Sequence, residues 1–167
     1  IDMRWHHGEH PRFGSIDVCP LIPVANITME ETVVHAHELA SRLGEEVGLS
    51  VYCYEHAARI EQRRNLAIVR EGEYEGLEDR IATSDWKPDF GPQLFNPRSG
   101  ATAVGARDFL VAYNVNLNTT STRRANAVAF DVREKGRKKR RGNPLTGPIV
   151  KDNKGEDVWN PGSLKSV

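Results

Sequence analysis

Residues 16–54 decide the fold, and they read IDVCPLIPVANITMEETVVHAHELASRLGEEVGLSVYCY. Two apolar runs rich in branched and aromatic residues, 16–24 and 49–54, have the composition of strands. The segment between them has helical periodicity, so the order is strand, helix, strand. This order predicts an α/β unit, with a right-handed crossover if both strands run parallel in one sheet.

The helix is predicted over residues 28–48. Thr28 and Glu31 have the spacing of a capping box, in which each side chain accepts a hydrogen bond from the backbone of the other residue. Gly48 provides a left-handed stop. Apolar or small residues recur every three or four positions and form one helix face: Met29, Val33, Ala36, Ala40, Leu43 and Val47.

Beyond this unit, residues 59–69 and 73–82 predict two short, charged surface helices separated by Gly72. Helical periodicity then disappears over residues 84–105. Residues 85–100 contain three prolines, two glycines and three aromatic side chains. A loop of this length is typical of a binding loop, and the alternative interpretation is an interdomain linker.

The C-terminal part predicts a strand over residues 109–118 and a helix over 121–135 that Gly136 ends. A basic run follows, which we interpret as a solvated turn because no aromatic residue is interleaved with it. Its members are Arg137, Lys138, Lys139, Arg140 and Arg141. The tail from residue 143 to 167 predicts loops and a weak hairpin at 153–155.

The composition is that of an ordinary folded protein, with 38% hydrophobic and 28% charged residues among 167. Lys and Arg total 23 and Asp and Glu total 23, so no overall field recruits nucleic acid or an anionic membrane. The sequence has no long apolar run and no leader, which predicts a cytoplasmic protein. Cys19 and Cys53 lie in strand-like segments and are expected to be buried, reduced thiols. Because the chain begins with Ile1, we expect it to be part of something longer.

Titratable side chains are most concentrated in residues 6–14, HHGEHPRFG. Gly8, Pro11 and Gly14 break regular structure, so this segment is predicted to be a loop at the start of the first strand. His7, Glu9 and His10 could bind a metal in a hydrolase, act in acid–base catalysis, or be structural. The residues by themselves leave these alternatives open.

Three segments resemble the formiminotransferase domain, which occurs alone in glutamate formimidoyltransferases and fused to a cyclodeaminase. They are GEHPRFGSIDVCPLIPV at 8–24, DWKPDFGP at 85–92 and GATAVGARDFLVAYNVNL at 100–117. The resemblance implies an α/β (α+β sandwich-like) fold with two related subdomains, each a mixed sheet with helices on its outer face. It implies that residues 1–107 belong to the first subdomain and 108–167 to the second, both incomplete here.

The resemblance also implies a transferase that moves a formimidoyl group between N-formimidoyl-L-glutamate and tetrahydrofolate in histidine degradation. Tetrahydrofolate is then a co-substrate and no metal is expected. His10 is implied as the catalytic proton relay, and Arg12 is a candidate carboxylate contact or, equally, a structural ion pair. The implied folate contacts are Gly91, Pro92, Gln93, Leu94, Phe95, Asn96, Pro97, Arg98, Ser99 and Gly100.

Other expectations follow from the same resemblance. No nucleic-acid or membrane partner is expected, and the intact protein is a candidate homodimer. The chain alone is expected to lack full activity. The alternative function, from another class, is a non-catalytic folate-binding module.

Overall fold

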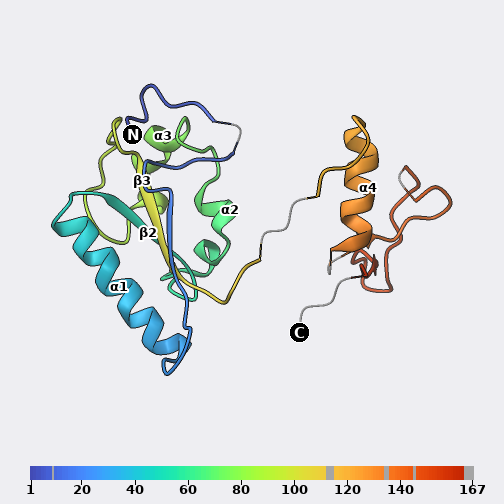
Figure 1. Cartoon of the computed structure of the whole chain (residues 1–167), viewed down its shortest axis with the longest axis horizontal. Coiled ribbons are helices and arrows are strands. Elements are labelled where there is room, and N and C mark those ends of the chain that lie inside the picture. Colours follow the sequence, from blue (N-terminus) through green and yellow to red (C-terminus); the bar gives the residue numbers. More distant parts are fainter. Residues whose placement is uncertain (9, 112–114, 134–135, 145, 164–167) are drawn as a thin grey trace. The chain divides into compact units, whose positions relative to one another are not determined.

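The computed structural model forms two compact units, Ile1–Val111 and Ala112–Val167 (Figure 1). Both units contain helices and strands, which confirms the α/β class. The structure describes residues 1–8, 10–111, 115–133, 136–144 and 146–163.

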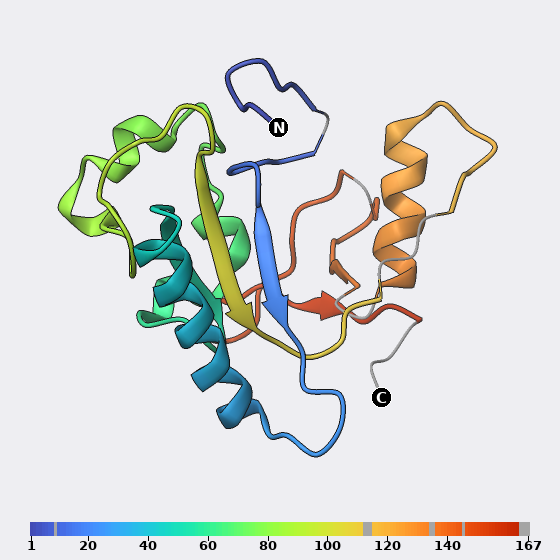
Figure 2. The same ribbon diagram turned by 60° about the vertical axis from the view of Figure 1, so that its left-hand side comes forward.

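The first unit is built on a three-stranded sheet of β1 (Val18–Leu21), β2 (Ser50–Glu55) and β3 (Ala101–Ala106) in the order β1-β3-β2. All three strands are parallel, and Figure 2 shows the β1 and β3 arrows pointing the same way. A mixed sheet was expected, but antiparallel pairing in this unit is confined to isolated bridges such as Val51 with Phe90. The cause is that helical crossovers, rather than hairpins, connect the described strands.

The central strand, β3, was not predicted from the sequence. Its residues, ATAVGA, are mostly small, whereas strand prediction relies on branched and aromatic residues. Every residue of β3 is buried, because the strand lies between two others and is covered on both faces. A Cβ atom on Gly105 would lie only 2.5 Å from the Tyr54 ring. The small residues therefore let bulkier neighbours pack closely over the middle of the sheet.

The helix α1 (Met29–Glu45) begins with the predicted capping box. The Thr28 amide donates to Glu31 Oε2 at 2.8 Å, and the Glu31 amide donates to Thr28 Oγ1 at 3.2 Å. The predicted apolar face packs on the sheet except for Val47, which lies beyond the helix end and is exposed. Gly48 has the expected left-handed backbone, with φ of +73°.

Short elements cover the opposite face of the sheet, so helices lie on both faces rather than on one. They are η1 (Glu61–Arg64), α2 (Leu66–Val69), α3 (Leu77–Ile81) and η2 (Ser84–Trp86). Figure 1 shows α1 and α2 on opposite sides of the strands. Strand β2 explains this arrangement, because Tyr52 and Tyr54 pack in one apolar cluster while Val51 and Cys53 pack in the other. A strand that is apolar on both sides requires two covers.

A buried ion pair fixes the start of the long loop to β2. The Arg63 and Asp89 side chains are only 5% and 8% exposed, and Arg63 Nη1 lies 2.9 Å from Asp89 Oδ2. Asp89 also accepts a hydrogen bond from the Cys53 amide at 2.7 Å, and Arg63 donates to the Lys87 carbonyl at 2.8 Å. This part of the loop is therefore held rigidly.

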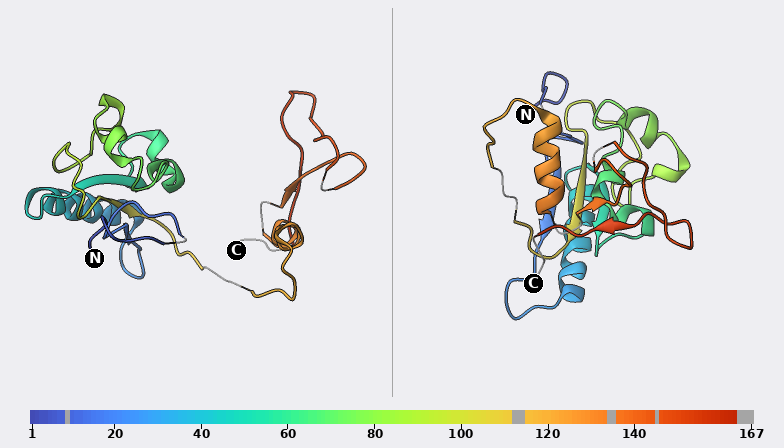
Figure 3. Two further views of the ribbon diagram at one scale, coloured as in Figure 1. Left: turned by 90° about the horizontal axis from the view of Figure 1, so that it is seen from above. Right: turned by 90° about the vertical axis from the view of Figure 1, so that its right-hand side faces the viewer.

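The second unit contains α4 (Thr122–Val132), which the Ser121 side chain caps. Figure 3, left, looks down the axis of α4 and shows the tail of the chain to one side of it. Two short antiparallel strands pair in this unit: β4 (Arg137–Lys138), which follows α4, and β5 (Trp159–Asn160), which lies in the tail. The prediction of a solvated turn is therefore wrong for Arg137 and Lys138, because a partner strand distant in sequence pairs with them.

The weak hairpin expected at 153–155 is confirmed. Lys151 and Asp157 form an antiparallel bridge, and the Gly155 amide donates to the Asp152 carbonyl at 3.1 Å. The ladder therefore continues outward from β4 and β5 to this turn.

The strand predicted over 109–118 is not formed in the described part of that range. Residues 109–111 and 115–118 are in neither a strand nor a helix, and Phe109, Leu110 and Val111 are exposed. Residues 112–114 lie outside the described residues, as do 134–135 at the predicted end of α4.

None of the described helices has the length and apolar character needed to cross a bilayer.

Candidate functional site

The N-terminal segment that carries the histidines is joined by its backbone to the end of the 91–100 loop. The Ser15 amide donates to the Ser99 carbonyl at 2.8 Å, and Gly14 and Gly100 form an antiparallel bridge. Nearer the terminus, the Met3 amide donates to the Arg98 carbonyl at 2.9 Å. Two regions that were singled out separately in the sequence therefore form one surface.

The beginning of the 91–100 loop lies against α1 and β2. Gly91 has φ of +79°, and a Cβ atom there would lie 1.9 Å from the Leu49 carbonyl oxygen. Ser50 Oγ donates to the Pro92 carbonyl at 2.7 Å, and the Gln93 amide side chain donates to the Ile81 carbonyl at 3.0 Å. Both ends of the loop are therefore fixed by contacts with the sheet unit.

Tyr74 links the two regions and was missed in the sequence. Its amide donates to the Arg12 carbonyl at 2.8 Å, and its hydroxyl donates to the Pro97 carbonyl at 2.6 Å. Its ring packs against Phe95 with the centroids 5.5 Å apart. The neighbouring Glu73 has a left-handed backbone, with φ of +54°, which is uncommon outside glycine. Periodicity gave no signal for this turn, because it joins two short helices.

Arg12 is engaged by carboxylates of its own chain. Its Nη2 atom lies 2.5 Å from Glu75 Oε1, and its Nη1 atom lies 3.8 Å from Glu73 Oε2. The Arg12 guanidinium holds the pKa of Glu75 below its usual value by hydrogen bonding to it. Arg12 also donates to the His6 carbonyl at 3.1 Å. Arg12 was a candidate for a substrate-carboxylate contact or for a structural ion pair. The structure contains the ion pair, with Glu75.

His10 is exposed, and its neighbour Pro11 is one of the residues that line a hollow of about 450 Å³. The other residues that line this hollow are Leu66, Ala67, Arg70, Glu71, Gly72 and Glu73. Asp17 fixes the chain below it, because Asp17 Oδ1 accepts from the Phe13 amide at 2.8 Å and Asp17 forms an ion pair with Arg70. An exposed imidazole on an anchored loop can reach a bound molecule and exchange protons with it.

Comparison with known protein families identifies the family of this chain. The family model described as "Formiminotransferase domain, N-terminal subdomain" matches residues 1–107, and the one described as "Formiminotransferase domain" matches 112–167. The chain belongs to the formiminotransferase domain family. This confirms the resemblance that the three sequence segments indicated.

Curated relatives of this chain carry names that match the family. It is 51% identical over 137 residues to the formimidoyltransferase-cyclodeaminase of Dictyostelium discoideum and 53% identical over 137 residues to that of Gallus gallus. In both cases the match covers 82% of this chain and 25% of the relative. The glutamate formimidoyltransferase of Streptococcus pyogenes serotype M1 is 45% identical over 136 residues, which are 81% of this chain and 46% of that protein. The chain therefore spans between a quarter and half of these relatives.

Most of the implied folate contacts are accessible in this family member. Within 91–100, Gly100 is buried, Phe95 and Ser99 are half-buried, and the other residues are exposed. Asn96 Oδ1 accepts from the Arg98 and Ser99 amides at 3.0 and 3.2 Å, which fixes the turn at the loop tip. The loop thus presents side chains to solvent from a backbone that is already ordered.

The metal-hydrolase interpretation depended on His7, Glu9 and His10, of which Glu9 lies outside the described residues. Among the residues that the structure describes, no three His, Cys, Asp or Glu side chains gather as a potential metal site.

Proposed function

We propose that this chain serves the transfer of a formimidoyl group between N-formimidoyl-L-glutamate and tetrahydrofolate. The observation that carries the proposal is the backbone pairing of Gly14 with Gly100, which places the histidine segment beside the implied folate loop. It is supported by relatives named glutamate formimidoyltransferase and formimidoyltransferase-cyclodeaminase.

The chemistry requires two proton transfers. When the amine of tetrahydrofolate attacks the formimidoyl carbon, a new C–N bond forms and this amine must lose a proton. When the C–N bond to glutamate breaks, the leaving amine must gain one. We assign both transfers to the imidazole of His10, which is exposed and precedes Pro11, a residue that lines the hollow.

The folate would bind along residues 91–100. The Phe95 ring, supported by Tyr74, offers an aromatic surface for a planar ring system. The exposed Arg98 offers a guanidinium for a carboxylate. Arg12 would contact a substrate carboxylate only if Glu75 shared or released it.

The test is a transfer assay with both substrates, in which mass spectrometry quantifies the formimidoyl-folate product. The glutamate formimidoyltransferase of Thermoplasma acidophilum, a relative 47% identical over 137 residues, is the positive control for the assay. We expect less product with the wild-type chain than with this relative, loss of the remaining product with His10→Ala, and its retention with His7→Ala. Equal transfer by His10→Ala and the wild type would exclude His10 as the relay.

Folate binding is measured separately through the fluorescence of Trp5, which is 79% exposed and follows two positions after Met3, whose amide donates to the Arg98 carbonyl. A Trp5→Phe variant gives the background. Binding without transfer would favour the alternative, a non-catalytic folate-binding module. Absence of both binding and transfer would reject the proposal.

A role in histidine degradation, a cytoplasmic location and a homodimeric intact protein belong to the same proposal. The pathway and the homodimer rest on the family resemblance, and the location rests on the apolar pattern of the sequence.

A further inference from the structure

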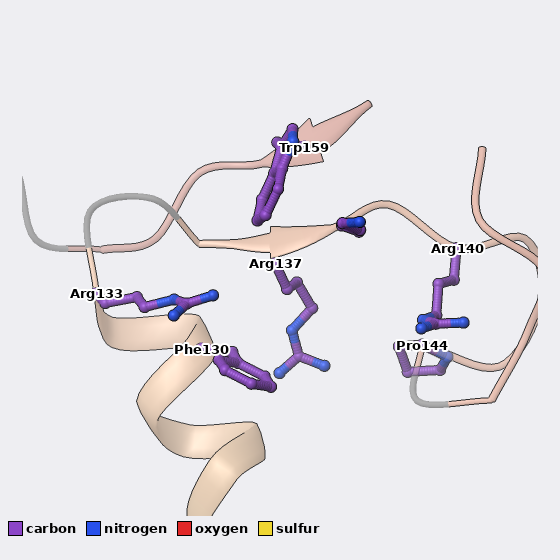
Figure 4. A pocket seen from close by; sticks show the side chains of 7 residues that line it. Phe130, Arg133, Arg137, Arg140, Pro144 and Trp159 are labelled. Carbon is purple, nitrogen blue, oxygen red and sulfur yellow. The ribbon is translucent and has the colours of Figure 1, made fainter. Parts of the chain in front are cut away.

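The second unit contains a pocket of about 240 Å³ that the proposed transfer does not use. Figure 4 shows it between the end of α4, β4 and the following loop. Its lining combines basic and aromatic side chains: Phe130, Arg133, Arg137, Lys138, Arg140, Pro144 and Trp159. Three members of the basic run therefore come together with aromatic rings that are not interleaved with them in the sequence.

Two of the arginines in the pocket are held by carbonyl groups. Arg133 Nε donates to the Gly136 carbonyl at 3.0 Å, and Arg140 Nη1 donates to the Gly147 carbonyl at 2.6 Å. The Arg133 guanidinium also lies 4.4 Å from the Phe130 ring centroid. A carbonyl oxygen orients a guanidinium but carries no full charge to neutralise it, so positive charge remains at the pocket.

The Arg137 side chain is only 15% exposed. It pairs with Asp131, and its Nη2 atom donates to the Ala127 carbonyl at 2.8 Å. Its Nε atom is buried and has no hydrogen-bond partner among the residues that the structure describes. A buried donor of a charged group is costly to leave unpaired, so the charge of Arg137 is incompletely compensated by the described residues.

Lys138 adds a fourth positive charge. Its Nζ atom lies 2.5 Å from Asp157 Oδ2 and 5.8 Å from the Trp159 ring centroid. Four cations thus line the pocket, and carboxylates from the described residues pair with two of them. Counted over the described residues, the pocket keeps a net positive charge.

We propose that this pocket binds a small organic oxyanion with two negative charges, either a phosphate monoester or a dicarboxylate. The planar guanidinium groups match both kinds of oxyanion with paired hydrogen bonds. Phe130 and Trp159 supply apolar surface for the body of the ligand. Phosphate esters and dicarboxylates both present negatively charged oxygen atoms on an organic body. The experiment below determines which of the two classes binds.

The experiment is a titration of the whole chain, labelled with ¹⁵N, that follows the indole N–H signals of its three tryptophans. Glycerol phosphate and glutarate are the two probes, with sodium chloride at matched ionic strength as reference. A Trp159→Phe variant assigns the reporter signal. We expect the Trp159 signal to shift saturably with one or both probes, and the Trp5 signal to stay in place.

Variants test the residues that carry the inference. Arg137→Gln should weaken binding by about tenfold or more, since a hydrogen bond to a charged group is lost. Because Arg137 also holds Ala127, Arg140→Gln is examined beside it, and the wild-type pattern of backbone signals verifies folding. Arg123→Gln, on α4 but outside the pocket lining, is the charge-matched control and should bind as the wild type does.

The outcomes separate the sources of the anion. Saturable binding of glycerol phosphate alone identifies a phosphate ester, and binding of glutarate alone identifies a dicarboxylate. Shifts that follow ionic strength and are equal in sodium chloride would overturn the proposal. Equal binding by the wild type and a folded Arg140→Gln variant would overturn it too.

Discussion

Gly14 and Gly100 pair in an antiparallel bridge, and they are in contact because neither has a side chain. A Cβ atom on Gly14 would lie 2.1 Å from the Ala101 carbonyl oxygen, and one on Gly100 would lie 2.5 Å from the Phe13 carbonyl oxygen. Both distances are far below van der Waals contact. This close approach of two backbones joins the segment of His10 to the implied folate loop.

Gly14→Ala should therefore lower the free energy of unfolding by about 1–3 kcal/mol, because backbone atoms must move to admit the methyl group. Gly8→Ala is the matched control on the same segment, since its new Cβ would meet nothing closer than the His6 ring at 3.4 Å. Urea unfolding measures both variants. Equal stability of the two would show that the Gly14 contact is looser than the structure has it.

Tyr74→Phe should weaken folate binding several-fold while changing stability by less than about 1.5 kcal/mol. The variant loses the hydroxyl bond to the Pro97 carbonyl, which lies at an exposed position. Tyr52→Phe is the control. It also loses a hydrogen bond from a tyrosine hydroxyl to a carbonyl, but this carbonyl belongs to Trp86, outside residues 91–100. A similar loss of affinity in both variants would contradict a specific role for Tyr74.

Arg63→Ala should cost about 3–5 kcal/mol in the free energy of unfolding, because it leaves the buried Asp89 carboxylate without its cation. Arg64→Ala removes an exposed arginine whose ion pair with Glu61 spans 3.8 Å, and should cost about 0–1 kcal/mol. Thermal and urea denaturation measure the difference. If both substitutions had the same small effect, the buried ion pair of Arg63 with Asp89 would not contribute measurably to stability.

Stability should fall in alkaline solution. Burial raises the pKa of the Cys53 thiol from 9.0 to about 12 and that of the Tyr52 hydroxyl from 10.0 to about 12. The unfolded chain releases these protons at a lower pH than the folded chain, so the free energy of unfolding is unaffected below about pH 9 and declines from there to about pH 12.

Cys53→Ala should make this alkaline decline shallower, although the variant is less stable at neutral pH. Denaturant midpoints between pH 7 and pH 11 provide the measurement. A decline as steep as that of the wild type would attribute the effect to other groups.

Prediction from the sequence succeeded where local signals are strong. The capping box at Thr28, the amphipathic face of α1 and the β2 run of branched and aromatic residues were all found where expected. It failed at β3, whose small residues resemble a loop until the strands on either side are in place. It also failed at Arg137 and Lys138, which acquire a strand partner only from residues 159–160.

The candidate site divides in the same way. The sequence by itself indicated the family through three motif segments, and His10 and the loop 91–100 stay predictions that this resemblance implies. Only the tertiary structure placed Gly14 against Gly100, occupied Arg12 with Glu75, and brought Tyr74 to both loops. Such contacts depend on residues far apart in sequence, and no periodicity or motif encodes their distances.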